Sequence, residues 1–219
     1  MTMTHSARIA DLTTSFNEAM ARFLTRLDAL SGDQFSRTPE GGGWNSAQIA
    51  WHVAATNEAF AGLIDGSIPN AKPAPDGFTE TPWSTIAKDV PAKLEAPQRF
   101  HPPATVTSAE ALTKLRASQQ HLVAALAGLA EDRATHTVKS TVGAPISLYQ
   151  VAIWAAAHVA RHNANEKEHQ RRDPEHGGHA PKEPPDDVVG HRKPRLSGVG
   201  YLSSHASMYF RPKPQYMCG

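Results

Sequence analysis

Apolar residues recur at intervals of three and four positions in four segments of the chain, and this spacing predicts four amphipathic α-helices. The first stripe includes Ile9, Phe16, Met20, Phe23 and Leu27. The four segments are residues 6–30, 46–65, 107–129 and 147–172. Four amphipathic helices in one chain favour an all-α fold, a four-helix bundle, because each apolar stripe needs other helices to cover it.

The starts of three of these helices carry residues that cap helix N-termini. Ser, Thr and Asn side chains accept hydrogen bonds from the first free N–H groups of a helix, and a Glu or Gln three positions later completes a capping box. The capping positions are Asn45 or Ser46 for the second helix, Thr107 with Glu110 for the third, and Ser147 with Gln150 for the fourth.

A proline-rich stretch, residues 67–106, separates the second helix from the third. We expect it to form a long crossover with one short helix near residues 84–88. Residues 163–172 are charged, and we expect this end of the fourth helix to leave the bundle. Proline, glycine and charged residues then dominate, so we expect a bundle domain over 1–172 and an irregular, disordered C-terminal extension over 173–219.

Composition narrows the class of protein. The 219 residues carry a formal net charge of +1 and are 40% hydrophobic. This near-neutral charge gives no reason to expect nucleic acid as a partner, and no apolar run reaches the roughly 20 residues that span a membrane. The single cysteine, Cys218, has no partner for an internal disulfide, and we expect a cytoplasmic protein. Histidine is unusually frequent, with 12 residues.

Two of these histidines, His158 and His162, are four residues apart in the fourth helix, so their side chains share one face. A third, His52, falls on the apolar stripe of the second helix. Buried imidazoles need partners, and three of them suit zinc, nickel, copper or ferrous iron while leaving a coordination position open. The simpler alternative is a metal-free bundle whose histidines are hydrogen-bonded in the core.

Other kinds of metal site fit the histidines of this sequence less well. A zincin site requires Glu directly after the first histidine, and Val159 stands there. His169 lies about 16 Å along the helix from His158, too far to share its site. We expect the histidines of the C-terminal extension to be solvated; they are His176, His179 and His191.

Several segments, in order and spacing, resemble the DinB-like (YfiT-like) superfamily. Residues 44–54, WNSAQIAWHVA, resemble the signature of its second helix. The stretch FHPP at residues 100–103, followed by SAEAL at 108–112, resembles the entry to its third helix. Residues 143–162, which end in HVARH, resemble its fourth helix, and the resemblance covers residues 6–170 in all.

The resemblance implies a four-helix bundle that holds a divalent metal ion with His52, His158 and His162. Zinc is the expected ion, with nickel or iron as alternatives. Members of this superfamily include transferases and isomerases that use low-molecular-weight thiols, and others are described as metal-dependent hydrolases. Many form homodimers, so the resemblance also implies a dimer.

We therefore expect a metal-dependent transferase or hydrolase that activates water or a low-molecular-weight thiol for a small-molecule substrate. Gln48 and Glu166, each one turn from a histidine of the set, are candidates for orienting a ligand or moving a proton; a solvated helix face is the simpler interpretation, above all for Glu166. Trp44, Trp51 and Trp154 either line a pocket or belong to the core. The alternative function is a non-catalytic stress or sensor module that binds a metal or an apolar ligand.

Overall fold

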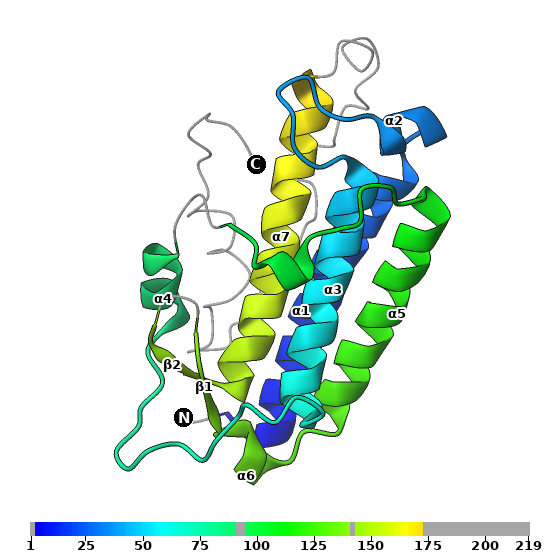
Figure 1. Cartoon of the computed structure of the whole chain (residues 1–219). Helices are drawn as coiled ribbons and strands as arrows, with labels where there is room; N and C mark the ends of the chain where they lie inside the picture. The colour runs from blue at the N-terminus through cyan, green and yellow to red at the C-terminus, as the bar shows by residue number, and fades with distance from the viewer. Residues whose placement is uncertain (1–2, 91–94, 141–142, 173–219) are drawn as a thin grey trace, which may run out of the picture.

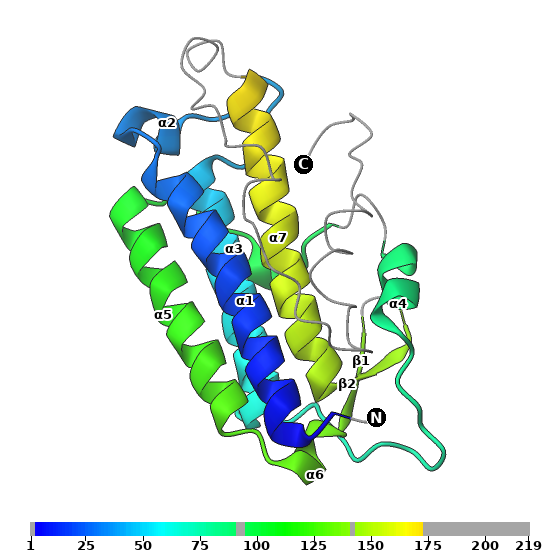
Figure 2. The same cartoon turned by 180° about the vertical axis from the view of Figure 1, so that it is seen from behind.

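The computed structural model describes residues 3–90, 95–140 and 143–172. Four long helices lie side by side in it and confirm the predicted all-α bundle (Figure 1). They are α1 (His5–Asp28), α3 (Ser46–Asp65), α5 (Ser108–Ala127) and α7 (Leu148–Arg172). Helix α3 lies between α5 and α7, and α1 closes the bundle on the opposite side, where Figure 2 shows it in front.

Helices α1 and α7 run in one direction and α3 and α5 in the other (Figure 1). Accordingly, Arg26 near the end of α1 donates a hydrogen bond to Asn163 late in α7, with Nε and Oδ1 2.9 Å apart. Because α3 and α5 are parallel neighbours, the chain must return along the bundle between them. Residues 66–107 form this connection, which confirms the expected long crossover.

The connection carries two short elements, α4 (Trp83–Asp89) and the 3₁₀ turn η1 (Gln98–Phe100). The first confirms the short helix expected near residues 84–88. Four further elements are absent from the sequence-based expectation because each has five residues or fewer, too few for a hydrophobic period to show. They are α2 (Gly32–Ser36), α6 (Glu131–Ala134) and the antiparallel strands β1 (Thr137–Lys139) and β2 (Pro145–Ser147).

The predicted stripes form the core. Phe16, Met20 and Phe23 of α1 are completely buried between the helices. The predicted N-caps also form, with Asn45 capping α3 and Thr107 capping α5, but of the box predicted for Thr107 and Glu110 only the Thr107 half is present. At the start of α7 the Ser147 and Gln150 side chains each accept a hydrogen bond from the other's backbone N–H, so both halves of that capping box are present.

The expectation that residues 163–172 leave the bundle is wrong at Glu166. The helix continues to Arg172, and Glu166 is only 2% exposed. Glu166 follows His162 by four residues, so it lies on the same inward face despite its charged neighbours. The proposed extension, 173–219, lies outside the described residues. Within the described part, no helix is both long and apolar enough to cross a membrane.

Candidate metal centre

Three histidine rings meet between α3 and α7. His52 lies in the first half of α3, and His158 and His162 lie one turn apart on either side of the middle of α7. Because these two helices are antiparallel, those parts of them lie at the same level of the bundle. One ring nitrogen from each histidine lies within 4.8 Å of the others, and the ring centroids are 4.6–5.2 Å apart. The structure thus brings together the three histidines that the sequence singled out.

The two rings on α7 already have the spacing of a shared ion. Nε2 of His158 and Nε2 of His162 are 3.2 Å apart. Two nitrogens bound tetrahedrally at 2.0–2.1 Å from one zinc ion would be about 3.3 Å apart. The donor set therefore fits a divalent cation.

The third ring is held from outside the cluster. Nδ1 of His52 lies 3.0 Å from the carbonyl oxygen of Phe100 in η1. A carbonyl can only accept, so Nδ1 carries the proton and Nε2 keeps its lone pair. Histidines that bind metals commonly have their second nitrogen fixed in this way. The contact leaves His52 in the tautomer that a ligand needs.

Burial keeps all three rings neutral. It lowers the pKa of His158 to about 3, with further lowering from the neighbouring His52 and Arg161. Burial also lowers the pKa of His162 well below the ordinary value, again helped by nearby positive charge. The pKa of His52 is lowered by burial, and its bond to Phe100 opposes that shift in part. Neutral imidazole is the form that binds metal ions.

Glu166 lies one turn beyond His162 and is buried, so the expectation of a solvated position is wrong. Its Oε1 accepts a hydrogen bond of 2.6 Å from the hydroxyl of Ser46, the first residue of α3. Its Oε2 is buried and has no hydrogen-bond partner among the described residues. The sequence analysis named Ser46 only as a possible helix cap and not as a partner of Glu166, although its place at the helix start level with Glu166 follows from the antiparallel packing.

Gln48, the other candidate, uses its whole side chain in local contacts. Its Oε1 accepts from the backbone N–H of Asn45 at 3.1 Å. Its Nε2 donates to the carbonyls of Pro103 and Ala104 at 3.2 and 3.3 Å. Gln48 therefore links the start of α3 to the chain that follows η1.

The three tryptophans have different surroundings. The Trp44 ring packs against His52 with centroids 5.0 Å apart, so it borders the histidine cluster. Trp154 packs edge-on against Trp83 of α4 at 5.5 Å. The Lys114 ammonium lies 5.2 Å from the centroid of Trp51. Of the three, Trp44 is the one in ring contact with a histidine of the cluster.

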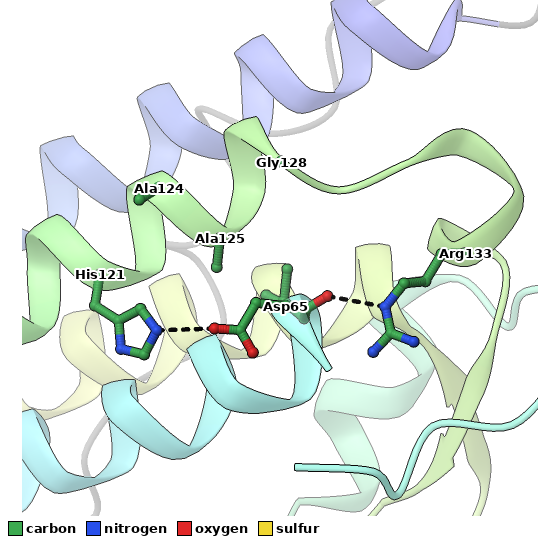
Figure 3. A pocket seen from close by; sticks show the side chains of 7 residues that line it. Asp65, His121, Ala124, Ala125, Gly128 and Arg133 are labelled. Carbon is green, nitrogen blue, oxygen red and sulfur yellow. Dashed lines mark hydrogen bonds and ion pairs between the residues drawn. The ribbon is translucent and has the colours of Figure 1, made fainter. Parts of the chain in front are cut away.

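A second polar group lies at the ends of α3 and α5, beside an open cavity of about 260 Å³ (Figure 3). His121 bonds Glu58 through Nδ1 at 2.6 Å and Asp65 through Nε2 at 2.9 Å. No pattern in the sequence pointed to this group. The two carboxylates hold opposite nitrogens of one ring, so the three residues are not arranged around a common ion as the histidines are.

The fold and the cluster define a class: a helical-bundle protein with a three-histidine centre of the kind that holds a divalent metal. The model of the DinB superfamily matches residues 15–164 of the chain. The chain belongs to the DinB superfamily, as the sequence motifs indicated.

Solved structures show the same fold. A mycothiol-dependent maleylpyruvate isomerase is similar with a TM-score of 0.51 and 16% identity, over 75% of this chain and 62% of that one. A histidine-to-alanine variant of such an isomerase gives 0.53 and 15% over the same shares. A conserved protein from Enterococcus faecalis gives 0.50 and 16%, over 73% of this chain and 93% of that one. This chain thus spans less than two thirds of the isomerase chains, and no curated protein matches it in sequence.

Proposed function

We propose that the protein is a metal-dependent transferase or hydrolase in which His52, His158 and His162 hold one divalent ion, with zinc as the expected metal. The observation that carries the proposal is the meeting of three neutral imidazoles from two helices within 4.8 Å. Three protein ligands are the pattern of catalytic zinc sites, in which a further position stays open.

A low-molecular-weight thiol is the co-substrate that the comparisons favour, because the similar isomerases are mycothiol-dependent. A divalent ion in this position supplies Lewis-acid activation, which lowers the pKa of a thiol or a water molecule. The chain's own residues provide the surroundings. The Phe100 carbonyl orients His52. Glu166, with one oxygen on Ser46 and the other unpartnered, is our candidate to accept the proton.

The first test is the metal itself. Protein purified without a histidine tag should contain about one divalent ion per chain by elemental analysis. His158→Ala should lose most of it, because two nitrogens bind far more weakly than three. His121→Ala removes a histidine outside the cluster and should leave the content unchanged. An unchanged metal content in His158→Ala would rule out the three-histidine site.

The second test is turnover. Metal-loaded protein is incubated with low-molecular-weight thiols, mycothiol among them, and an electrophilic acceptor, and thiol consumption is followed; ester substrates test hydrolysis. Consumption that stops in His158→Ala supports the enzyme. Stoichiometric metal with no turnover of any thiol or ester would instead support the non-catalytic sensor or stress module.

A further inference from the structure

The segment 96–104, which we name the strap, passes over the first turns of α3 beside the histidine cluster. In Figure 1 it lies in front of α3 and α7 and includes η1. Two side chains of α3, one turn apart, hold it. The first is His52, which donates to the Phe100 carbonyl at 3.0 Å. The second is Gln48, which donates to Pro103 and Ala104.

The orientation of the Gln48 amide is fully determined. Its oxygen faces a backbone N–H, that of Asn45, and its nitrogen faces two carbonyl oxygens. A flipped amide would point its NH₂ group at a donor and its oxygen at two acceptors, which is unfavourable. Both ends of the amide are therefore engaged, one with its own helix and one with the strap.

We propose that Gln48 is a positioning residue for the metal centre: it fixes the strap, and the strap's Phe100 carbonyl fixes the His52 ring. His52 can present a lone pair to the cluster only while its other nitrogen donates its proton elsewhere. The Phe100 carbonyl, which accepts this hydrogen bond, is three residues from Pro103. A strap released at Pro103 and Ala104 lets that carbonyl move, and the His52 ring is then free to rotate.

The aromatic contacts support this role. The Trp44 ring packs against His52 and also lies edge-on to His101, with centroids 5.5 Å apart. His101 in turn bonds the Ala96 carbonyl at 2.8 Å, which closes the strap on itself. Displacing the strap thus also removes the His101 contact that supports the Trp44 ring beside His52.

The chain offers a matched control. Gln150 takes the same place in the capping box of α7, and its Nε2 donates to the carbonyl of Thr81 at 2.6 Å. It stands in the first turn of α7, eight residues before His158. Gln48→Ala and Gln150→Ala therefore remove the same kind of contacts, and only the first concerns the strap.

The readout is Co²⁺ binding, followed by its visible absorption, together with hydrogen exchange of the His52 ring N–H in metal-free protein by NMR. We expect Gln48→Ala to raise the Co²⁺ dissociation constant about tenfold, near the low end of the effects of groups that orient metal ligands. Ring N–H exchange should also become faster. Gln150→Ala should lower the melting temperature and leave both readouts unchanged.

A second variant separates the strap from the cap. Gln48→Glu retains an acceptor for the Asn45 N–H but has no hydrogens for Pro103 and Ala104, so it should also speed exchange of the His52 ring proton. Unchanged exchange and unchanged Co²⁺ affinity in Gln48→Ala, or equal losses in Gln150→Ala, would overturn the inference.

The inference rests on the proposed function only for its affinity readout. If the unaltered protein binds no Co²⁺, the three-histidine site fails as a metal site. The exchange of the His52 ring proton still decides the role of Gln48, because it is measured without metal.

Discussion

The side chains of the metal centre differ in the hydrogen-bond partners of their second polar atom. His52 has a carbonyl on its second nitrogen, whereas Nδ1 of His158 and Oε2 of Glu166 are buried without hydrogen-bond partners in the described part of the chain. A buried polar atom left in this way costs about 1–3 kcal/mol. These two buried polar atoms make this part of the bundle less stable than a core of leucines would be. Such a cost is typical of a site retained for binding.

Replacing Ser46 with Ala should lower the free energy of unfolding by about 1.5–3 kcal/mol, because the buried Glu166 carboxyl then loses its one described hydrogen bond. Urea unfolding measures the loss. Adding Glu166→Gln to Ser46→Ala should recover part of it, since a neutral amide costs less to bury than a charge. Strictly additive effects of the two changes would show that the contact does not contribute.

For single residues, the sequence was informative where the position along the helical repeat alone determines which way a side chain faces. His52, His158 and His162 were predicted to face inward because each falls on an apolar stripe. Glu166 has the same phase as His162, but its charged neighbours made a solvated position look more probable. The contact to Phe100 could not be predicted, because a proline-rich connection has no period that fixes its path.

Between elements, α3 and α5 are joined at their C-terminal ends. His121 of α5 bonds both Glu58 and Asp65 of α3, and Arg133 donates to the Leu63 and Ile64 carbonyls that end α3. Helix α3 stops there at Gly66, whose φ of +92° suits glycine, and a Cβ at this position would lie 2.9 Å from the Arg133 guanidinium. The Arg133 side chain that caps α3 therefore requires the glycine at position 66, where any larger residue would collide with it.

The join between α3 and α5 should weaken with rising pH. The bond to Glu58, and then that to Asp65, raises the pKa of His121 above 6.5. The contribution of His121 to the free energy of unfolding is therefore complete below about pH 6.5, and it is lost as the pH rises through the raised pKa. More than a third of the side chain is exposed, so we expect less than about 1 kcal/mol.

The measurement compares urea unfolding at pH 5.5 and 8.5 for the unaltered protein and for His121→Gln. The histidines of the cluster shift stability in the opposite direction, since their pKa values are lowered and the folded state loses stability as the pH falls below 6.5. The difference between the two proteins isolates His121. It should be larger at pH 5.5, and an equal difference at both values would contradict the prediction.

At the scale of the whole molecule, side-chain contacts attach the long connection between α3 and α5 to the helices of the bundle. Glu80 accepts hydrogen bonds from Arg8 of α1 and from Ser147 at the start of α7. Arg8 also lies over the ring of Tyr149, 3.8 Å from its centroid. Together with the contacts of the strap, these bonds attach the connection to both ends of the bundle.

Glu80→Ala should therefore release the first part of the connection. We expect a loss of about 1–2 kcal/mol in the free energy of unfolding, because one hydrogen bond and one partly exposed ion pair disappear. Trypsin should cut several-fold faster after Lys88, which precedes Asp89 and lies in the same connection. Asp76→Ala removes an exposed acid of the same connection and should change neither quantity. Equal cleavage rates in the two variants would show that Glu80 does not hold the connection.

At this scale the topology was predictable, but the side-chain contacts that attach the connection to the bundle were not. A stretch of 40 residues between two predicted helices already implied a crossover. Which side chains would attach it depended on residues far apart in sequence, such as Arg8, Glu80 and Ser147, and no local pattern links them. The hairpin of β1 and β2 was missed for the reason that three-residue strands leave no alternation to read.

The antiparallel meeting of α3 and α7 has a consequence for folding. The three histidines of the centre span residues 52–162, so no fragment shorter than 111 residues contains the complete set. An ion bound by His52 and His158 together would link two positions roughly 100 residues apart, and because these ligands meet only in the folded bundle, its binding free energy would stabilise the folded state alone. Metal would therefore enter only after the last helix has docked, and its capture would mark the completion of the bundle.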